Sequence, residues 1–450
     1  MDIIKTGIEK VLYPLMESRR GNRIRADISQ LQASAAGSRQ QLMQKQEADL
    51  SRLLLHCIQQ VPAYKQYAYL QQQIMADPAE ALSHFPVLTK EEFRKDPESF
   101  IALDADKSSL IANNSGGSTG RPLQFYMDRY TVEYYEAARW RGLALYGISP
   151  GSRCLMIWGN PFDLDKLGQK KFRLSERYLK NRRIIPAYGL KPEAMKEYIA
   201  LMRRYRPEYI YGYAGALALF SRLMLEQGLQ PGIRLKAVVS TSETLRPDDR
   251  EIIKQAFGAP VVNEYGARDG GIIAYECPKG GLHLSAENLI PEVVDMQTHK
   301  PLPIGSRGLL AVTDLHNFVQ PRLRYLLNDE VSLAAEPCPC GMATPCLQEI
   351  YGREDDIFKG KDGRYVHGVA FANCIKRLPQ VDAFQITQSS PEKATVLLVT
   401  KNGTWPEGLD AVKADYQELL PGTEFTWQLT DNIPPAPSGK TRYAIRNFPL

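Results

Sequence analysis

One short segment of the chain is dense in glycine and hydroxyl side chains. Residues 114–122 read Asn-Ser-Gly-Gly-Ser-Thr-Gly-Arg-Pro. Small residues in such a run let backbone N–H groups wrap around the oxygens of a polyphosphate. The β-compatible residues on either side, 109–111 and 123–126, predict a loop between two strands. The loop matches neither the Walker nor the dinucleotide pattern, so it indicates a different kind of nucleotide-binding loop, with a plain surface turn as the alternative.

Four further segments carry side chains that suit the same chemistry. Residues 263–269 read Asn-Glu-Tyr-Gly-Ala-Arg-Asp at the end of a predicted strand, where α/β folds bind ligands. Residues 313–329 end in Asp329 just after the apolar stretch 325–327, and a carboxylate in such surroundings needs a partner. Residues 352–356 read Gly-Arg-Glu-Asp-Asp, and residues 437–442 read Pro-Ser-Gly-Lys-Thr-Arg.

The segments between these motifs alternate between strand and helix patterns, which predicts parallel α/β layers. The expected strands are residues 153–158, 209–213, 236–240 and 259–263. The expected helices are residues 192–205, 214–227 and 247–257. Residues 270–350 are rich in glycine, proline and strand patterns, which indicates a distorted β-barrel or a small sheet.

The predicted fold class is therefore α/β, with two domains. The large N-terminal domain, residues 1–351, combines the parallel layers with the distorted β-barrel and begins with a helical accessory region over residues 1–75. The small C-terminal domain, residues 352–450, is predicted to be α+β. Its expected elements are strands at 384–387, 394–400 and 424–429 and a helix at 409–420.

Composition narrows the class of protein. The 450 residues are 44% hydrophobic and 24% charged with a net charge of +5, which is typical of a globular protein. Lysine and arginine are scattered, so we expect no nucleic-acid partner. No apolar run reaches the length of a membrane span, and we expect a cytoplasmic protein. The apolar face of residues 3–16 is expected to pack on the protein itself, with a membrane surface as the alternative.

Five cysteine and histidine residues form a second chemical signal. They are Cys277, His283, Cys338, Cys340 and Cys346. Thiolates together with an imidazole suit tetrahedral Zn²⁺, with Cys340 or Cys346 as the fourth ligand. The alternative is that these cysteines are small buried apolar side chains. A zinc ion here would be structural.

The order and spacing of the five motifs resemble the adenylate-forming superfamily, and specifically its phenylacetate-CoA ligase-like and CapK-like branch. The resemblance implies a ligase that uses ATP and Mg²⁺ to convert a carboxylic acid to an acyl-adenylate, releasing pyrophosphate, and then transfers the acyl group to CoA. Transfer to an acyl carrier protein, or to an amine or hydroxyl acceptor, is an open alternative. A nucleotide-binding protein with little turnover is another. The sequence leaves the oligomeric state open, a dimer included.

The same resemblance implies roles for individual residues. Glu264, Tyr265 and Gly266 match the nucleotide site, where the tyrosine stacks on adenine and the glycine allows close approach of the backbone. Asp329 matches the acid that binds the ribose hydroxyls, and Arg353 the base near the ribose and phosphate. The phosphate loop is matched by Ser115, Gly116, Gly117, Ser118, Thr119 and Gly120.

Two further matches concern catalysis by the C-terminal domain. Lys440 matches the lysine that bridges the acyl carboxylate and the α-phosphate, and Asp355 matches the hinge about which the small domain rotates. Asp269 matches the Mg²⁺ contact, although the superfamily usually has glutamate there. Arg121 stands where many relatives have lysine, and Asn328 stands where glycine is common.

The acyl pocket is expected where the predicted strand ends converge. Its candidate residues are Trp158, Tyr188, Tyr211, Tyr213 and Ser242. An aromatic lining suits an aryl or medium-length acyl acid. The residues do not distinguish between these acids.

Overall fold

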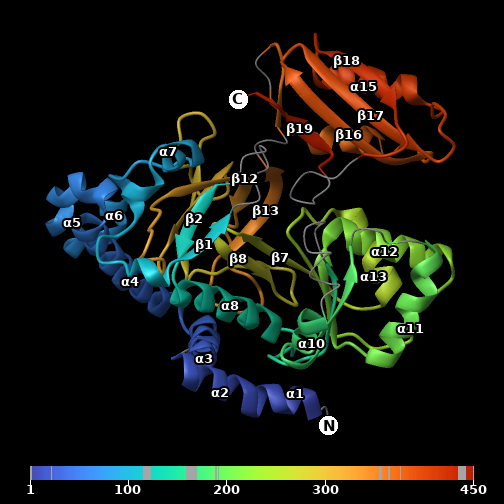
Figure 1. Ribbon diagram of the computed structural model, residues 1–450. Helices are drawn as coiled ribbons and strands as arrows, with labels where there is room; N and C mark the ends of the chain where they lie inside the picture. The colour runs from blue at the N-terminus through green and yellow to red at the C-terminus, as the bar shows by residue number, and fades with distance from the viewer. Residues whose placement is uncertain are drawn as a thin grey trace.

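The computed structural model describes residues 3–21, 23–114, 123–158, 170–187, 190, 192–353, 357–362, 365–375, 377–433 and 442–448. Figure 1 shows helices of the N-terminal region on one side of a large central sheet. A smaller sheet built from the last part of the chain lies above it. The motif-bearing strands belong to the large sheet.

The N-terminal region is helical. Its helices are α1 (Ile3–Gly7), α2 (Tyr13–Arg20), α3 (Ile24–Ala35), α4 (Arg39–Gln60), α5 (Gln71–Ala76), α6 (Pro78–Ser83) and α7 (Lys90–Lys95). A capping box between Ser38 and Gln41 starts α4 by satisfying free backbone N–H groups. Leu50, Leu53 and Leu54 of α4 are fully buried in the same core as the central strands. The longest of these helices is therefore part of the main domain's core.

The first half of the central sheet is parallel. Its strands are β3 (Cys154–Trp158), β4 (Arg182–Pro186), β5 (Tyr209–Tyr213), β6 (Ala237–Thr241) and β7 (Val261–Ala267). They are hydrogen-bonded in the order β4-β3-β5-β6-β7. The parallel α/β layers predicted from the alternating patterns are confirmed.

Helices cover both faces of the parallel strands. Those of this region are α8 (Arg129–Ala144), α10 (Lys170–Tyr178), α11 (Met195–Tyr205), α12 (Ala214–Glu226) and α13 (Pro247–Phe257). Side chains at alternate positions of each strand join different cores, as strand geometry requires. Ile210 and Val238 pack with α11, α12 and α13, while Tyr209 and Val239 pack with α3 and α8. Figure 1 shows α11 to α13 grouped on one side of these strands.

The second half of the sheet is antiparallel and continues directly from β7. Its strands are β8 (Gly271–Glu276), β9 (Leu282–Leu284), β10 (Leu289–Val294), β11 (Arg307–Asp314), β12 (Tyr325–Leu333) and β13 (Cys346–Arg353). Together with the parallel strands they form one sheet in the order β10-β11-β12-β13-β9-β8-β7. The region expected to form a distorted barrel or small sheet thus extends the parallel sheet, because the β7–β8 hairpin joins the two halves.

The C-terminal segment forms its own four-stranded sheet. The elements after β13 are β14 (Ile357–Lys359), β15 (Tyr365–His367), α14 (Gly368–Ile375), β16 (Val381–Ser390), β17 (Lys393–Thr400), α15 (Leu409–Leu419), β18 (Glu424–Leu429) and β19 (Ala444–Arg446). The sheet has the order β18-β17-β16-β19. Its buried apolar cluster comes entirely from residues 358–444, so this α+β unit has a core of its own.

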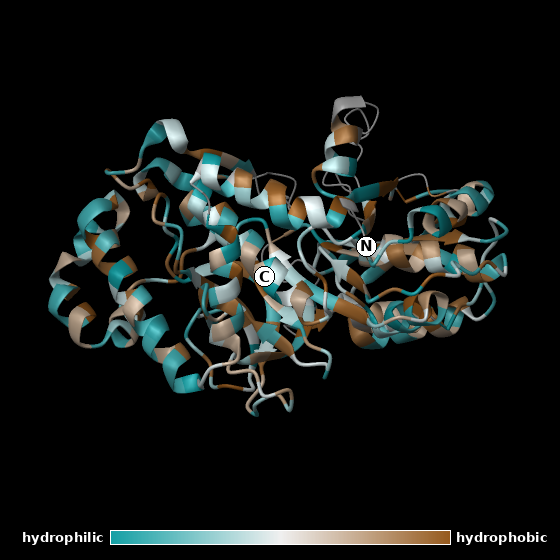
Figure 2. Ribbon diagram, turned by 90° about the horizontal axis from the view of Figure 1, so that it is seen from below, coloured by the Kyte–Doolittle hydropathy of each residue, from teal (hydrophilic) through white to brown (hydrophobic). Residues whose placement is uncertain are grey.

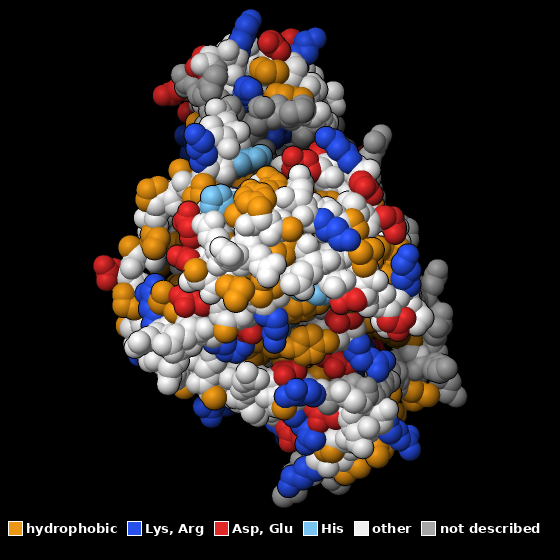
Figure 3. Space-filling model, turned by 90° about the vertical axis from the view of Figure 1, so that its left-hand side faces the viewer, with side chains coloured by type: hydrophobic (Ala, Val, Ile, Leu, Met, Phe, Trp, Pro, Cys, Tyr) orange, Lys and Arg blue, Asp and Glu red, His pale blue; other side chains and the backbone are white. Residues whose placement is uncertain are grey.

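The surface mixes hydrophobic, polar and charged residues. Figure 2 shows hydrophilic and hydrophobic residues alternating along the outer helices, and Figure 3 shows basic and acidic side chains interspersed over one face. Ile8 is buried, whereas Val11 and Leu15 on the same helical segment are 63% and 47% exposed. The N-terminal apolar face therefore packs on the protein only in part. Among the described residues, no helix is both long and apolar enough to cross a bilayer.

Candidate functional site

The predicted phosphate loop lies between two paired strands. β1 (Ile111–Asn114) and β2 (Gln124–Met127) are antiparallel, with Asn114 opposite Gln124. The prediction that the loop joins two strands is confirmed. The loop itself, with Ser115, Gly116, Gly117, Ser118, Thr119, Gly120 and Arg121, lies outside the described residues. So do Tyr188, Asp355 and Lys440, and Arg353 is described only through its backbone.

The 313–329 motif holds this hairpin in place. The Gln320 side chain accepts a hydrogen bond from the Tyr126 N–H at 2.7 Å, and Asn317 donates one to the Tyr126 carbonyl at 3.3 Å. Both amide side chains are fully buried. Because buried polar groups need partners, these bonds fix the position of β2. Sequence reasoning assigned no role to either residue.

Tyr265 and Asp329 meet at the joined halves of the sheet. Tyr265 is in β7 and Asp329 in β12, and the tyrosine hydroxyl donates a hydrogen bond to Asp329 Oδ2 at 2.7 Å. Arg353 lies directly opposite Asp329 on the neighbouring strand β13. Three residues that the resemblance assigns to the nucleotide are thus brought together. Tyr265 remains partly exposed, while Asp329 is buried.

Two unusual backbone positions flank this group. Asn328 has a φ of 62°, a left-handed conformation that asparagine tolerates better than most residues. This conformation accounts for asparagine at a position where the family commonly has glycine. Gly266 has no room for a side chain, because a Cβ there would lie 2.8 Å from the Gly271 carbonyl oxygen. The close approach of β7 and β8 therefore requires glycine at position 266, whether or not a nucleotide also lies nearby.

Asp269 is surrounded by donors from the protein. Its Oδ2 accepts a hydrogen bond from the Tyr325 hydroxyl at 2.9 Å and lies 3.8 Å from Lys90 Nζ. Burial raises the pKa of Asp269, but Lys90, Arg322 and the Tyr325 hydrogen bond outweigh it, and the pKa is lowered. A carboxylate oxygen already paired with an ammonium group is a poor ligand for Mg²⁺. The geometry fits an ion pair at Asp269 better than a metal contact.

Arg322 connects Asp269 to the loop hairpin. Its guanidinium donates to the Asp269 backbone carbonyl at 2.9 Å and lies 4.7 Å from the ring centre of Phe125 in β2. The side chain is almost completely buried. A buried arginine must find such partners, and the sequence motif alone gave Arg322 no role.

The described acyl-pocket candidates lie on or just after three of the parallel strands, β3, β5 and β6. The Trp158 ring centre is 4.2 Å from that of Tyr213 and 5.7 Å from that of Tyr211. Ser242, just after β6, is only partly buried and has a φ of 67°. Residues whose backbone is held in this sparsely populated conformation are common at functional sites.

Glu264 belongs to this aromatic group in space. Its Oε1 accepts hydrogen bonds from the Tyr211 hydroxyl at 2.5 Å and from Thr241 Oγ1 at 3.1 Å. Its Oε2 lies 3.5 Å from Arg139 Nε, a residue of α8 that sequence reasoning missed. Successive side chains of a strand point to opposite faces, which separates Glu264 from the contact between Tyr265 and Asp329.

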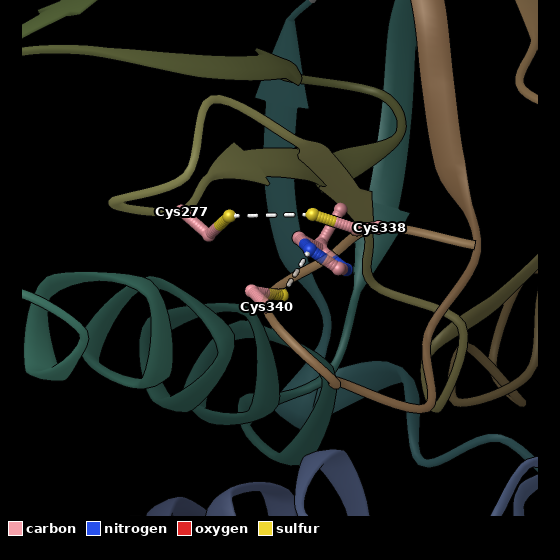
Figure 4. Close-up of side chains that lie close together, drawn as sticks. Cys277, Cys338 and Cys340 are labelled. Carbon is pink, nitrogen blue, oxygen red and sulfur yellow. Dashed lines mark hydrogen bonds between the residues drawn. The ribbon is translucent and has the colours of Figure 1, made fainter. Parts of the chain in front are cut away.

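Of the five residues predicted as possible zinc ligands, four lie close together and one does not. Ligand atoms of Cys277, His283, Cys338 and Cys340 all lie within 4.8 Å of one another. Figure 4 shows the side chains of Cys277 and Cys338 pointing toward each other, with Cys340 close by. Cys346 is opposite His283 on the adjoining strand but is not part of this group. Of the two alternatives for the fourth ligand, the structure favours Cys340.

Known sequences resemble this chain over most of its length. A family model for the CapK C-terminal domain matches residues 358–447. Protein CapK of Staphylococcus aureus is 27% identical over 373 residues, which are 82% of this chain and 80% of the relative. A phenylacetate-coenzyme A ligase of Thermus thermophilus is 27% identical over 333 residues, which are 71% of this chain and 72% of the relative.

Solved structures share the fold. A 2-hydroxyisobutyryl-CoA ligase in the postadenylation state, in complex with 2-HIB-AMP, has a TM-score of 0.66 at 18% identity, covering 89% of this chain and 88% of that one. ATP-bound MatB from Rhodopseudomonas palustris has a TM-score of 0.53 at 17% identity. The match covers 75% of this chain and 68% of MatB. The chain therefore has the fold of adenylate-forming CoA ligases and ends in a CapK C-terminal domain, which confirms its resemblance to the phenylacetate-CoA ligase-like and CapK-like branch.

Proposed function

We propose that this protein is an AMP-forming acid–CoA ligase. It activates a carboxylic acid with ATP as an acyl-adenylate and then transfers the acyl group to CoA. The relative from Thermus thermophilus is named a phenylacetate-coenzyme A ligase, and one structural neighbour is a 2-hydroxyisobutyryl-CoA ligase in complex with 2-HIB-AMP. These names support the reaction class and leave the acid open.

The contact between Tyr265 and Asp329 is the observation that carries the proposal. The Asp329 carboxylate, which accepts a hydrogen bond from the Tyr265 hydroxyl at 2.7 Å, would also accept hydrogen bonds from ribose hydroxyls. The same bond fixes the orientation of the tyrosine ring, so that one face can stack on adenine. Arg353 pairs with Asp329 from the neighbouring strand β13, which supports the role near the phosphate that the motif gives it.

The remaining parts of the mechanism are assigned by the motifs. Backbone N–H groups of Ser115–Gly120 would bind the phosphates, and the Lys440 ammonium would stabilise the charge that develops between the carboxylate and the α-phosphate. Asp355 would be the hinge between the domains 1–351 and 352–450, which have separate cores. Mg²⁺ would arrive with the ATP phosphates and neutralise their charge. We assign it no ligand at Asp269, whose Oδ2 is paired with Lys90.

The acid is expected to be an aryl or medium-length acyl acid. The contact of Trp158 with Tyr213 provides an aromatic wall at the strand ends, which suits a flat or apolar group. Glu264 places a carboxylate beside this wall, bonded to Tyr211. A polar substituent on the acid would face this carboxylate, so hydroxylated and unsubstituted acids should be compared directly.

Acid-dependent exchange of radiolabelled pyrophosphate into ATP tests the first half-reaction. We expect exchange with at least one member of a panel of aryl and aliphatic acids, with and without hydroxyl groups. Lys440→Ala is the inactive control. If ATP binds and no acid supports exchange, the protein is a nucleotide-binding protein without this activity.

A competition between acceptors tests the second half-reaction. The acyl-adenylate formed on the enzyme is offered CoA, a holo-acyl carrier protein, or neither. We expect acyl-CoA to form faster than the acylated carrier protein. Preferential acylation of the carrier would retain the adenylation chemistry and reject CoA as the acceptor.

A further inference from the structure

We propose that Cys277, His283, Cys338 and Cys340 bind one structural Zn²⁺ that fixes the start of β13. The proposal does not depend on the ligase activity, because adenylation needs no metal bound by cysteine. Two segments far apart in sequence supply the ligands. Cys277 directly follows β8 and His283 is in β9, whereas the two other cysteines lie on the loop before β13 (Figure 4).

The arrangement of the ligand atoms approaches that of a tetrahedral zinc centre. Zn–S bonds of about 2.3 Å place two tetrahedral sulfur ligands about 3.8 Å apart. The Sγ atoms of Cys277 and Cys338 are 3.7 Å apart, and Cys340 Sγ is 3.1 Å from His283 Nε2. All four ligand atoms lie within 4.8 Å of one another, so small shifts of these side chains would suffice to coordinate a metal.

The histidine is already oriented for metal binding. His283 Nδ1 lies 3.0 Å from the Thr344 backbone carbonyl, which can only accept a hydrogen bond. In the neutral ring, Nδ1 therefore carries the proton and Nε2 presents its lone pair to the cysteines. Zinc-binding histidines typically make such a second bond to a carbonyl oxygen. The Thr344 hydroxyl, also 3.0 Å away, supports the same orientation.

The backbone wraps closely around the four side chains. A Cβ at Gly281 would lie 2.5 Å from Cys338 Sγ and 3.2 Å from His283 Nε2, so any side chain there would enter the ligand sphere. Each cysteine segment is closed by a turn, with Gly280 N–H donating to the Cys277 carbonyl at 2.8 Å and Gly341 N–H to the Cys338 carbonyl at 3.2 Å. Both glycines have positive φ angles of 86° and 83°. These turns hold the ligands together without a disulfide.

The location gives the metal a structural task. β13 begins at Cys346, pairs with β9 at its start and with β12 along its length, and ends with Arg353 opposite Asp329. The loop from Cys338 to Cys346 also contacts α3, through a hydrogen bond from Ala343 N–H to the Ala35 carbonyl at 3.0 Å. A metal at this point would hold β13 to β9 and thereby keep its register against β12.

Metal content is the direct test. Protein purified without chelator should contain about one equivalent of zinc per chain, because such sites bind tightly when the thiolates are preorganised. The double variant Cys338→Ser/Cys340→Ser should lose the zinc. Cys346→Ser is the matched control, because this cysteine lies beside the four ligands, and it should retain the zinc. Zinc-exposed wild-type protein without bound metal, or a double variant with wild-type zinc content, would overturn the proposal.

Two measurements on the wild-type chain keep the test decisive if the double variant does not fold. Replacement of the metal by Co²⁺ should give the thiolate-to-cobalt absorption and intense visible bands of a tetrahedral site. Removal of the metal by chelator should lower the melting temperature and increase amide hydrogen exchange in β13 (Cys346–Arg353), while β16 and β17 of the C-terminal sheet should stay protected. Unchanged exchange and melting, or a Cys277–Cys338 disulfide in metal-free native protein, would contradict a structural zinc.

Discussion

The hydroxyl of Tyr265 and the carboxylate of Asp329 are joined by a hydrogen bond of 2.7 Å between β7 and β12. β7 is the last parallel strand of the sheet, and β12 belongs to its antiparallel half. The bond therefore connects the parallel half of the sheet to the strand that pairs with Arg353. Because both residues match the nucleotide site, disturbing one should alter what the other can do.

Asp329→Asn is expected to weaken binding of ATP and AMP. The amide keeps the size of the side chain but is a weaker acceptor for ribose hydroxyls, so the loss should be about 1.5–3 kcal/mol. Isothermal titration with nucleotide and with its 2′,3′-dideoxy analogue measures this. The wild type should discriminate between the two sugars, and the variant should bind them nearly equally. Discrimination as strong as in the wild type would show that Asp329 does not read the ribose.

Tyr265→Phe isolates the hydroxyl from the ring. The variant keeps the stacking surface and loses the bond to Asp329, so nucleotide affinity should fall by about 0.5–1.5 kcal/mol, less than for Tyr265→Ala. In a double-mutant cycle with Asp329→Asn, the two effects should be coupled because the residues are in contact. Strictly additive losses in nucleotide affinity would mean that the bond does not contribute to binding.

The left-handed backbone of Asn328 predicts an order of stability among its variants. At a φ of 62°, Asn328→Gly should be close to neutral in the free energy of unfolding. Asn328→Val should cost about 1–2 kcal/mol, because a β-branched side chain collides with the backbone in this conformation. Urea unfolding of both variants tests the order. A valine variant as stable as the glycine variant would contradict the strain.

Lowering the pH should weaken the contribution of Asp269 to the stability of the fold. Lys90, Arg322 and Tyr325 hold its pKa below the ordinary value, so the carboxylate stabilises the fold above about pH 4, and this contribution is lost as pH falls through the folded pKa. Asp269→Asn should therefore be destabilised relative to the wild type at pH 7, and the difference should shrink in acid. The exposed Asp410 of α15 provides the control, since Asp410→Asn should show a small difference at every pH. If the difference in stability between the wild type and Asp269→Asn stays constant as the pH falls, the ion pair is refuted.

The sequence was sufficient to predict the position of helices and strands that have a regular hydrophobic pattern. β5 and α13 occupy the ranges predicted from residues 209–213 and 247–257. The continuity of the large sheet was missed, because it depends on the tight β7–β8 hairpin, in which Ala267 pairs with Gly271. No change of composition marks that junction, so the strands beyond it read as a separate sheet.

The candidate site shows a similar division. Motif order identified Tyr265 and Asp329, which are 64 positions apart, but gave no indication that they bond to each other. The resemblance also assigned Glu264 to the nucleotide site, but the motif gave no indication that its carboxylate bonds to Tyr211. Arg139 was missed because α8 carries it into the site from a helix without a chemical motif. Such contacts arise from packing between elements and are not encoded in spacing.

Lys440→Ala is expected to reduce pyrophosphate exchange by about 10²–10³-fold, because a preorganised cation is lost where charge develops in the transition state. ATP affinity should change little, since the lysine acts on that developing charge and not on the bound nucleotide. Lys413→Ala is the matched control. Lys413 is an exposed lysine of the same CapK C-terminal domain that pairs with Asp410, and its removal should leave exchange unchanged. If exchange in Lys440→Ala stays near the wild-type rate while Lys413→Ala behaves as expected, the match of residues 437–442 to the catalytic motif is wrong. If ATP affinity falls in parallel with the rate, Lys440 binds the ground-state nucleotide instead.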